Sequence, residues 1–217
     1  MSMPQVTLSF AQSLDGSIAA QPGRRTVLSG PESMAYTHRL RASHDAILVG
    51  IGTVIADNPK LTVRLAPGAH PQPIVLDSAL RIPLSCNLIA NPVMPLWVMC
   101  AQDAPAERQH ALEGVGAQVL RVNAPGAYHT RWPVLLGALA ARSVGTLMVE
   151  GGARVIASML TGNAAHRLAV AIAPRLLGGL RALDAQIDPA LLQRLVNVRY
   201  EKLGEDMILE ADLVNSL

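Results

Sequence analysis

The stretch VEGGAR, residues 149–154, joins the apolar run GTLMV to VIASML, whose apolar residues recur with helical spacing. A strand thus ends in the carboxylate Glu150, and two glycines follow before the helix begins. Glycine is normally a cost inside an element, so it is kept where the backbone needs a positive φ or another group approaches closely. Such a turn also presents unpaired N–H groups at a helix N-terminus, where a phosphate can bind. The stretch predicts a βα unit whose turn is either simply tight or binds phosphate.

The composition indicates an aliphatic core. Of the 217 residues, 50% are hydrophobic, 16% are charged and only 3% are aromatic. A core of Val, Ile, Leu and Ala suits β-branched strands sandwiched between helices. The length fits one large α/β domain or two small ones. We expect a single domain over residues 1–217, because no shift in composition marks a boundary.

Charge and cysteine content argue against several classes of partner. The 18 basic and 16 acidic residues are scattered and give a net charge of +2, and no basic run is longer than Arg24-Arg25. With few aromatic residues to stack on bases, no nucleic-acid partner is expected. Cys86 and Cys100 lack metal-ligand spacing, so we expect reduced packing residues, no metal and a cytoplasmic protein. No apolar run has the length of a membrane span, so no membrane partner is expected.

Apolar runs of strand length alternate with helical patterns, which predicts an α/β fold with a mostly parallel central sheet flanked by helices. Strands are expected at residues 5–12, 46–49, 73–76, 96–100, 118–122, 146–149 and 167–173. Helices are expected at residues 31–42, 105–114, 132–142 and 153–160. Residues 198–203 and 206–213 are expected to form a C-terminal antiparallel hairpin at the sheet edge. Three loops, residues 13–30, 50–73 and 174–191, exceed what simple connections need and are expected to be functional.

Polar clusters follow four of the predicted strands, at the edge where open α/β sheets bind ligands. They are Ser13-Leu14-Asp15-Gly16, residues 50–59 extended to Arg64, Asp77-Ser78 with Arg81, and Glu150-Gly151-Gly152. Taken singly, each has an ordinary structural explanation: Asp15-Gly16 fits a turn, Asp57 a helix cap and Arg81 a solvated charge. Four such clusters at one edge favour a ligand site.

Two of these clusters carry glycine turns, GIGT at residues 50–53 and EGG at residues 150–152. Two such turns could hold a dinucleotide pyrophosphate from opposite sides. A Rossmann dehydrogenase would instead carry one G-x-G-x-x-G after its first strand, which here ends in SLDG. The six histidines lie in mostly loop or helix-surface surroundings, and no serine-histidine-acid arrangement is visible. Hydrolysis through a covalent intermediate is therefore not expected.

Six motifs span nearly the whole chain in the order SLDGSIAA, LSGPE, HRLRASHDAILVGIGTVIADNPKLTVR, PIVLDSALRIP, LMVEGG and APRLLGG. Together they resemble the pyrimidine-reductase family of riboflavin biosynthesis. The resemblance implies a dihydrofolate-reductase-like fold and a homodimer. It also implies that a hydride from NADPH reduces the ribosyl group of an aminopyrimidine 5′-phosphate to ribityl. The substrate would be 5-amino-6-(5-phosphoribosylamino)uracil or its 2,5-diamino analogue.

The resemblance also implies roles for individual residues. It assigns substrate binding to Arg41, Leu61, Arg64 and Glu150, and arginine suits the bidentate binding of phosphate. Asp57 and Glu150 are the candidate catalytic carboxylates. Cofactor contacts are expected at Ala11, Thr53, Asp57, Ser78, Arg81, Gly151, Gly152, Ala153, Arg154, Val155, Ile156, Ala157 and Ser158, with Ser78 and Arg81 near the ribose 2′-phosphate. No metal is required, because hydride transfer is the chemistry of the cofactor.

Three positions depart from the pattern of this family. Arg25 stands where relatives commonly carry a serine at the substrate, Val27 where they carry a tryptophan at the cofactor, and Ser9 where a lysine is frequent. Two further hypotheses therefore stay open. One is an NADPH reductase of the same fold that acts on another pterin-like or carbonyl substrate, and the other is a non-catalytic nucleotide-binding module. The H-x-E and P-C-x-x-C signature of zinc deaminases is missing, so no deamination is expected.

Overall fold

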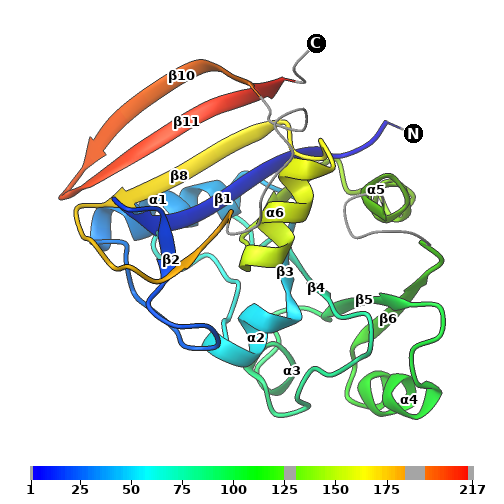
Figure 1. Ribbon diagram of the computed structural model, residues 1–217. Coiled ribbons are helices and arrows are strands. Elements are labelled where there is room, and N and C mark those ends of the chain that lie inside the picture. The colour runs from blue at the N-terminus through cyan, green and yellow to red at the C-terminus, as the bar shows by residue number, and fades with distance from the viewer. Residues whose placement is uncertain (1, 125–130, 184–193, 215–217) are drawn as a thin grey trace.

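The computed structural model describes residues 2–124, 131–183 and 194–214, and Figure 1 labels its elements. The strands are β1 (Gln5–Ser13), β2 (Ser17–Ala19), β3 (Ala46–Gly50), β4 (Gln72–Leu76), β5 (Trp97–Ala101), β6 (Gln118–Val122), β7 (Thr146–Val149), β8 (Arg167–Ala173), β9 (Leu180–Arg181), β10 (Arg194–Leu203) and β11 (Asp206–Val214). The helices are α1 (Pro31–Ala42), α2 (Ile51–Asp57), α3 (Asn87–Ala90), α4 (Ala106–Gly114), α5 (Trp132–Ala140) and α6 (Ala153–Thr161).

The main sheet joins nine of the described strands in the order β10-β11-β8-β1-β7-β3-β4-β5-β6. The strands from β8 to β6 pair in parallel, whereas β11 pairs antiparallel with β8. The expectation of a mostly parallel sheet flanked by helices is confirmed. In parallel register Leu48 lies beside Val149 and Gly50 beside Leu76. The polar residues that follow these strands therefore meet at one edge of the sheet.

Apolar side chains fill both faces of the sheet, because successive residues of a strand point to opposite sides. On β3, Leu48 packs in the cluster that contains Trp132 of α5 and Ile156 of α6. Its neighbour Val49 packs in a second cluster with α2, α3 and α4. In Figure 1, α6 crosses in front of the sheet while α1 lies behind it. The core is thus two aliphatic layers separated by the sheet.

The structure corrects the expected loops. The loop expected at residues 50–73 begins with the helix α2, and the other two long loops contain the paired strands β2 and β9. The sequence of α2, IGTVIAD, carries a glycine and four β-branched residues, so its helix propensity is low. Ile51 and Val54 are nevertheless buried in the core, and this packing stabilises the helix. Of the third loop, residues 184–191 lie outside the described residues.

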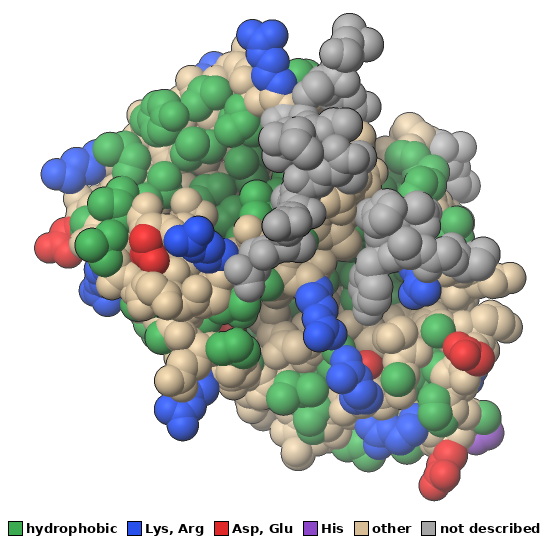
Figure 2. Space-filling view, viewed as in Figure 1, with side chains coloured by type: hydrophobic (Ala, Val, Ile, Leu, Met, Phe, Trp, Pro, Cys, Tyr) green, Lys and Arg blue, Asp and Glu red, His purple; other side chains and the backbone are tan. Residues whose placement is uncertain are grey.

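The expected C-terminal hairpin is confirmed as β10 and β11, which lie at the edge of the sheet (Figure 1). β11 covers β8, whereas β10 is exposed along most of its length. Figure 2 shows hydrophobic side chains gathered over this part of the molecule. The exposed ones on the hairpin are Leu195, Val198, Tyr200, Met207 and Val214. The hairpin therefore presents an apolar surface at the edge of the sheet.

Both cysteines lie in the core. Cys86 and Cys100 are free and buried in the cluster beside α2 and α4. Burial raises the pKa of each thiol, which disfavours the reactive thiolate. They are packing residues, as expected. In the part of the chain that the structure describes, no helix combines the length and apolarity needed to cross a membrane.

Candidate functional site

A cavity of about 790 Å³ opens at the carboxyl edge of the parallel strands. Ser9, Ala11, Ala169 and Ala171 line it from β1 and β8, and their small side chains leave space beside α1. Six arginines and two carboxylates belong to its described lining: Arg24, Arg25, Arg41, Arg64, Arg81 and Arg154, with Asp57 and Glu150. This excess of positive charge favours an anionic ligand.

The two glycine turns lie side by side in this cavity. The N–H of Gly50 donates to the carbonyl of Gly151 at 3.3 Å, and the hydroxyl of Thr53 donates to the same carbonyl at 3.5 Å. Gly151 and Gly152 have φ of +82° and +88°. A Cβ on Gly152 would lie 3.0 Å from Oγ1 of Thr53. Both positive φ and close approach therefore require glycine in the stretch VEGGAR.

The helix α6 begins directly after this turn. Its N-cap is Gly152, which has no side chain to cap the helix, and Ala153 and Arg154 line the cavity. The first N–H groups of an α-helix have no intrahelical partner and carry the positive end of the helix dipole. With the exposed guanidinium of Arg154 beside it, this turn can bind a phosphate group.

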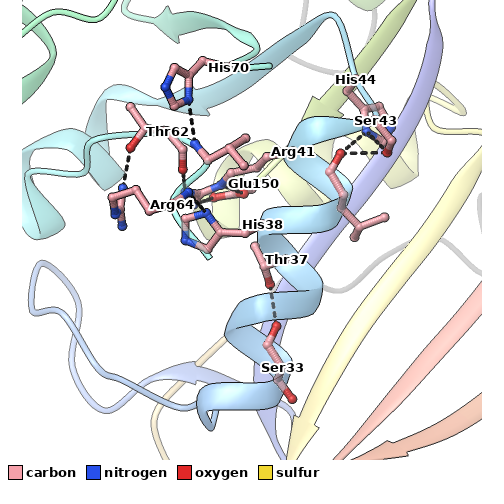
Figure 3. Close-up of polar contacts among 12 residues, drawn as sticks. Ser33, Thr37, His38, Arg41, Ser43, His44, Thr62, Arg64, His70 and Glu150 are labelled. Carbon is pink, nitrogen blue, oxygen red and sulfur yellow. Dashed lines mark hydrogen bonds and ion pairs between the residues drawn. The ribbon is translucent and has the colours of Figure 1, made fainter. Parts of the chain in front are cut away.

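Arg41 on α1 and Glu150 after β7 form an ion pair at the cavity wall (Figure 3). Nε and Nη2 of Arg41 donate to the two carboxylate oxygens of Glu150, each at 2.6 Å. Both side chains are mostly buried, with 12% and 14% exposed. We expected the fork of Arg41 to face a phosphate. In the structure Glu150 occupies that fork, so each residue orients the other.

Arg64 reaches the same wall from a loop between α2 and β4. Its Nη1 donates to the hydroxyl of Thr62 at 2.5 Å, and Nη1 of Arg41 donates to the carbonyl of Thr62 at 3.0 Å. Its backbone N–H donates to Nδ1 of His38 at 2.9 Å. Figure 3 shows these side chains converging from α1, from the loop and from the end of β7. The structure thus brings together the predicted Arg41, Arg64 and Glu150.

His38 is a residue of this wall that the sequence analysis missed. It is 4% exposed and lines the cavity. Burial, with the charges of Arg41 and Arg64, lowers its pKa from the ordinary value of 6.5, so the imidazole is neutral at neutral pH. The spacing of three between His38 and Arg41 could have indicated a shared helix face.

Asp57 ends α2 and also lines the cavity. Burial raises the pKa of its carboxyl group, and the nearby charge of Arg25 opposes this rise. A carboxyl group with a raised pKa holds its proton closer to neutral pH, which suits a general acid. Arg25, one of the three departures from the family pattern, therefore faces a candidate catalytic residue.

Arg81 lines the cavity beyond the end of β4. Its Nε lies 3.6 Å from Oδ1 of Asp77, and its side chain is 58% exposed. Asp77 itself is buried, and its Oδ2 accepts the N–H of Ile82 at 2.8 Å. Asp77 therefore supports the loop, while Arg81 keeps most of its guanidinium available to solvent or ligand.

Some predicted residues lie outside the cavity lining, namely Leu61, Ser78, Ala157 and Ser158. The side chain of Leu61 is 2% exposed and packs in the core. The hydroxyl of Ser158 donates to the carbonyl of Val155 at 3.0 Å and accepts from Nε1 of Trp132 at 3.2 Å. The side chains of Leu61 and Ser158 thus take part in packing inside the protein. Ser78, in contrast, is exposed.

The cluster after β1 also differs from expectation. The carboxylate of Asp15 accepts hydrogen bonds from the hydroxyls of Ser13 and Ser17 and from the N–H groups of Leu177 and Gly178. These bonds, that from Ser13 first, hold the pKa of Asp15 well below its usual range. Asp15 is not among the described residues that line the cavity. It ties the turn after β1 to the loop after β8.

Known proteins resemble this chain in sequence and in fold. A family model described as the RibD C-terminal domain matches residues 4–209. The 2,5-diamino-6-ribosylamino-4(3H)-pyrimidinone 5′-phosphate reductase of Methanothermobacter thermautotrophicus is 36% identical over 218 residues, which cover 95% of this chain and 97% of that protein. Acinetobacter baumannii RibD superposes with a TM-score of 0.85 at 26% identity, over 98% of this chain and 59% of that one.

A fourth comparison concerns the fold alone. Dihydrofolate reductase from Enterococcus faecalis, complexed with NADP(H), superposes with a TM-score of 0.54 at 15% identity, over 97% of both chains. The dihydrofolate-reductase-like fold expected from the sequence is confirmed. The chain spans almost all of the Methanothermobacter reductase but little more than half of RibD.

Proposed function

Because the chain belongs to the RibD C-terminal domain family, we propose that it is an NADPH-dependent reductase of riboflavin biosynthesis. It would reduce the ribosyl group of an aminopyrimidine 5′-phosphate to ribityl. The diamino compound named for the Methanothermobacter relative is the first candidate substrate, and the deaminated uracil is the second. The observation that carries the proposal is one cavity whose lining combines two adjoining glycine turns with Arg41, Arg64 and Glu150.

The residues present fit a dinucleotide cofactor. The positive φ at Gly151 and Gly152 opens the turn before α6, and the first N–H groups of a helix suit a pyrophosphate. Arg154 and Arg81 supply exposed positive charge on this side. We assign the pyrophosphate to residues 151–156 with Thr53, the nicotinamide to the wall at Ala11, and the 2′-phosphate to Arg81 with Ser78.

The remaining residues have roles on the substrate side. NADPH supplies the hydride when bound, so the protein orients the sugar and delivers a proton. Glu150, held by Arg41, offers carboxylate oxygens to substrate N–H and O–H groups. Arg64 binds the 5′-phosphate, assisted by the backbone at Leu61. Asp57, whose pKa burial raises, is the proposed proton donor.

Turnover with purified protein tests this function directly. NADPH oxidation is measured with the phosphorylated diamino pyrimidine, its deaminated analogue and the dephosphorylated diamino compound. Faster turnover of the phosphorylated compounds is expected, because the wall at Arg64 is cationic. Cofactor binding without turnover would leave a nucleotide-binding module, and turnover of only unphosphorylated carbonyl compounds would move the enzyme to another substrate.

The departures from the family pattern make the choice of substrate sensitive to one loop. Arg25 lines the cavity, and Val27 beside it is 57% exposed. Ser9, which stands where a lysine is frequent, is buried at the cavity floor. With Asp57 as the proposed proton donor, Asp57→Asn should abolish turnover while NADPH still binds.

We also propose the assembly and location of the protein. The apolar, exposed hairpin of β10 and β11 suits an interface between two copies, and an edge strand needs such cover. Sedimentation should show a homodimer, and a stable monomer at micromolar concentration would oppose it. One reductase domain is proposed, since strands from residue 5 to residue 214 enter one sheet. The free cysteines suit the reducing cytoplasm.

A further inference from the structure

Side chains hold the backbone of residues 62–64, which we call the strap. The carbonyl of Thr62 accepts from Nη1 of Arg41 at 3.0 Å. The N–H of Val63 donates to Nδ1 of His70 at 3.0 Å, and the N–H of Arg64 donates to Nδ1 of His38 at 2.9 Å. The strap belongs to no helix or strand. Backbone groups that are usually paired within secondary structure are therefore paired here with three side chains.

His38 of α1 is bonded to the strap at Arg64, whose side chain lines the cavity. Since its Nδ1 accepts a hydrogen bond, the neutral ring carries its hydrogen on Nε2. The ring is 4% exposed. The charged groups that act on it are Arg41 from α1, Arg64 from the strap and Glu150 after β7. Burial and the two arginines lower the pKa of His38, whereas Glu150 raises it.

We propose that His38 is a positioning residue for Arg64, and that protonation of its Nδ1 releases the strap and weakens binding of the substrate's phosphate. This inference rests on the proposed function, because it takes Arg64 as the phosphate ligand. A protonated Nδ1 is a donor, so it would face the N–H of Arg64 with no acceptor between them. The partly buried N–H would lose its partner, and the backbone that aims Arg64 would move.

The imidazole thus makes phosphate binding depend on pH. Because the pKa of His38 lies below the ordinary 6.5 in the folded protein, the strap is held at neutral pH and released only under acid conditions. The phosphate of the substrate also takes up a proton in this range, with a second pKa of about 6. A test must therefore separate the enzyme's titration from that of the ligand.

Two substitutions of His38 make this separation. His38→Asn places Oδ1 where Nδ1 lies, so it keeps an acceptor that does not titrate, whereas His38→Leu removes the acceptor. We expect His38→Leu to raise KM for the phosphorylated pyrimidine roughly tenfold, with little change in kcat or NADPH affinity. His38→Asn should restore most of this loss. Its KM should rise less at acid pH than that of the wild type, because only the ligand titrates.

Further variants tie the effect to Arg64. In an Arg64→Ala background, His38→Leu should add little to KM, because the group that it positions is absent. His110→Asn on the exposed face of α4 controls for loss of a histidine elsewhere and should keep the wild-type pH profile. An unchanged KM in His38→Leu, a wild-type pH profile in His38→Asn, or full additivity with Arg64→Ala would each overturn the inference.

A measurement without turnover separates this inference from the proposed function. Nitrogen NMR of the wild type should show Nδ1 of His38 unprotonated at neutral pH. Inorganic phosphate should shift the Arg64 amide resonance in wild type and His38→Asn, but much less in His38→Leu. This result supports the inference even if no pyrimidine is reduced. A protonated Nδ1, or an equal phosphate response in His38→Leu, would overturn it while leaving the reductase assignment intact.

Discussion

The glycine turns line the cavity, and the strap reaches it through Arg64, but the two regions are built differently. The turn before α6 is shaped by its own backbone, with positive φ at Gly151 and Gly152. The strap has no regular backbone pairing and is held by Arg41, His38 and His70. The first region needs the right residues at adjacent positions. The second needs side chains from distant segments, so a single substitution can loosen it without unfolding the sheet.

The largest expected effect is on cofactor binding at the glycine turn before α6, which is shaped by its own backbone. Gly152→Val should lower NADPH affinity roughly a hundredfold or more, because a β-branched residue resists positive φ and its side chain would enter the proposed pyrophosphate site. Fluorescence titration with NADPH measures the loss. Gly116→Val is a matched control, since Gly116 has φ of +87° and an added Cβ would meet no described atom within 4 Å. This control should lose stability but bind normally, and equal losses of affinity would refute a local effect.

The next largest effect is expected when the ion pair of Arg41 and Glu150 is broken, because Arg41 also holds the strap. Glu150→Ala should lower the free energy of unfolding by roughly 2–4 kcal/mol, because it leaves the mostly buried charge of Arg41 without its carboxylate. Urea denaturation measures this change, and NADPH affinity should persist. The double variant Arg41→Met with Glu150→Leu should be more stable than Glu150→Ala. If it were less stable, the pair would owe its role to something other than charge compensation.

A smaller effect distinguishes two arginines on the cofactor side. Arg81→Ala should weaken NADPH binding about tenfold and NADH binding little, because it removes the proposed charge-assisted bond to the 2′-phosphate. Arg154→Ala should weaken the binding of both cofactors alike, since Arg154 lies at the start of α6, beside the turn proposed to bind the pyrophosphate. Competition titrations with both cofactors measure this. Equal losses of both in Arg81→Ala would make Arg81 a support of the loop through Asp77.

The smallest effect separates the pH dependence of the fold from that of the strap. His44 contacts the carbonyl of Leu40 and the hydroxyl of Thr7 through its ring nitrogens, and burial lowers its pKa below 6.5. Below pH 6.5 the unfolded chain takes up a proton that the folded chain does not. The free energy of unfolding should therefore fall as the pH is lowered. His44→Gln should flatten this slope in urea denaturation. An unchanged slope would assign it to other groups.

Much of the fold was predicted from the sequence, because periodicity and turn chemistry act between neighbouring residues. The strands from β3 to β8 and the C-terminal hairpin follow apolar runs, and α6 follows the helical spacing of VIASML. The helix α2 was missed because its local propensity is low, and it forms through burial of Ile51 and Val54. The motifs also placed Thr53, Asp57, Arg64 and Glu150 at one edge of the sheet.

The sequence by itself determined the order of βα units, the glycine turn and the edge at which polar residues gather. Only the tertiary structure decided that Arg41 pairs with Glu150, which is 109 positions away, and that His38 accepts the N–H of Arg64, 26 positions away. The reason is physical. A backbone conformation is selected by the residue that adopts it and by its neighbours, whereas the partner of a long polar side chain is selected only when folding brings distant segments together and excludes water.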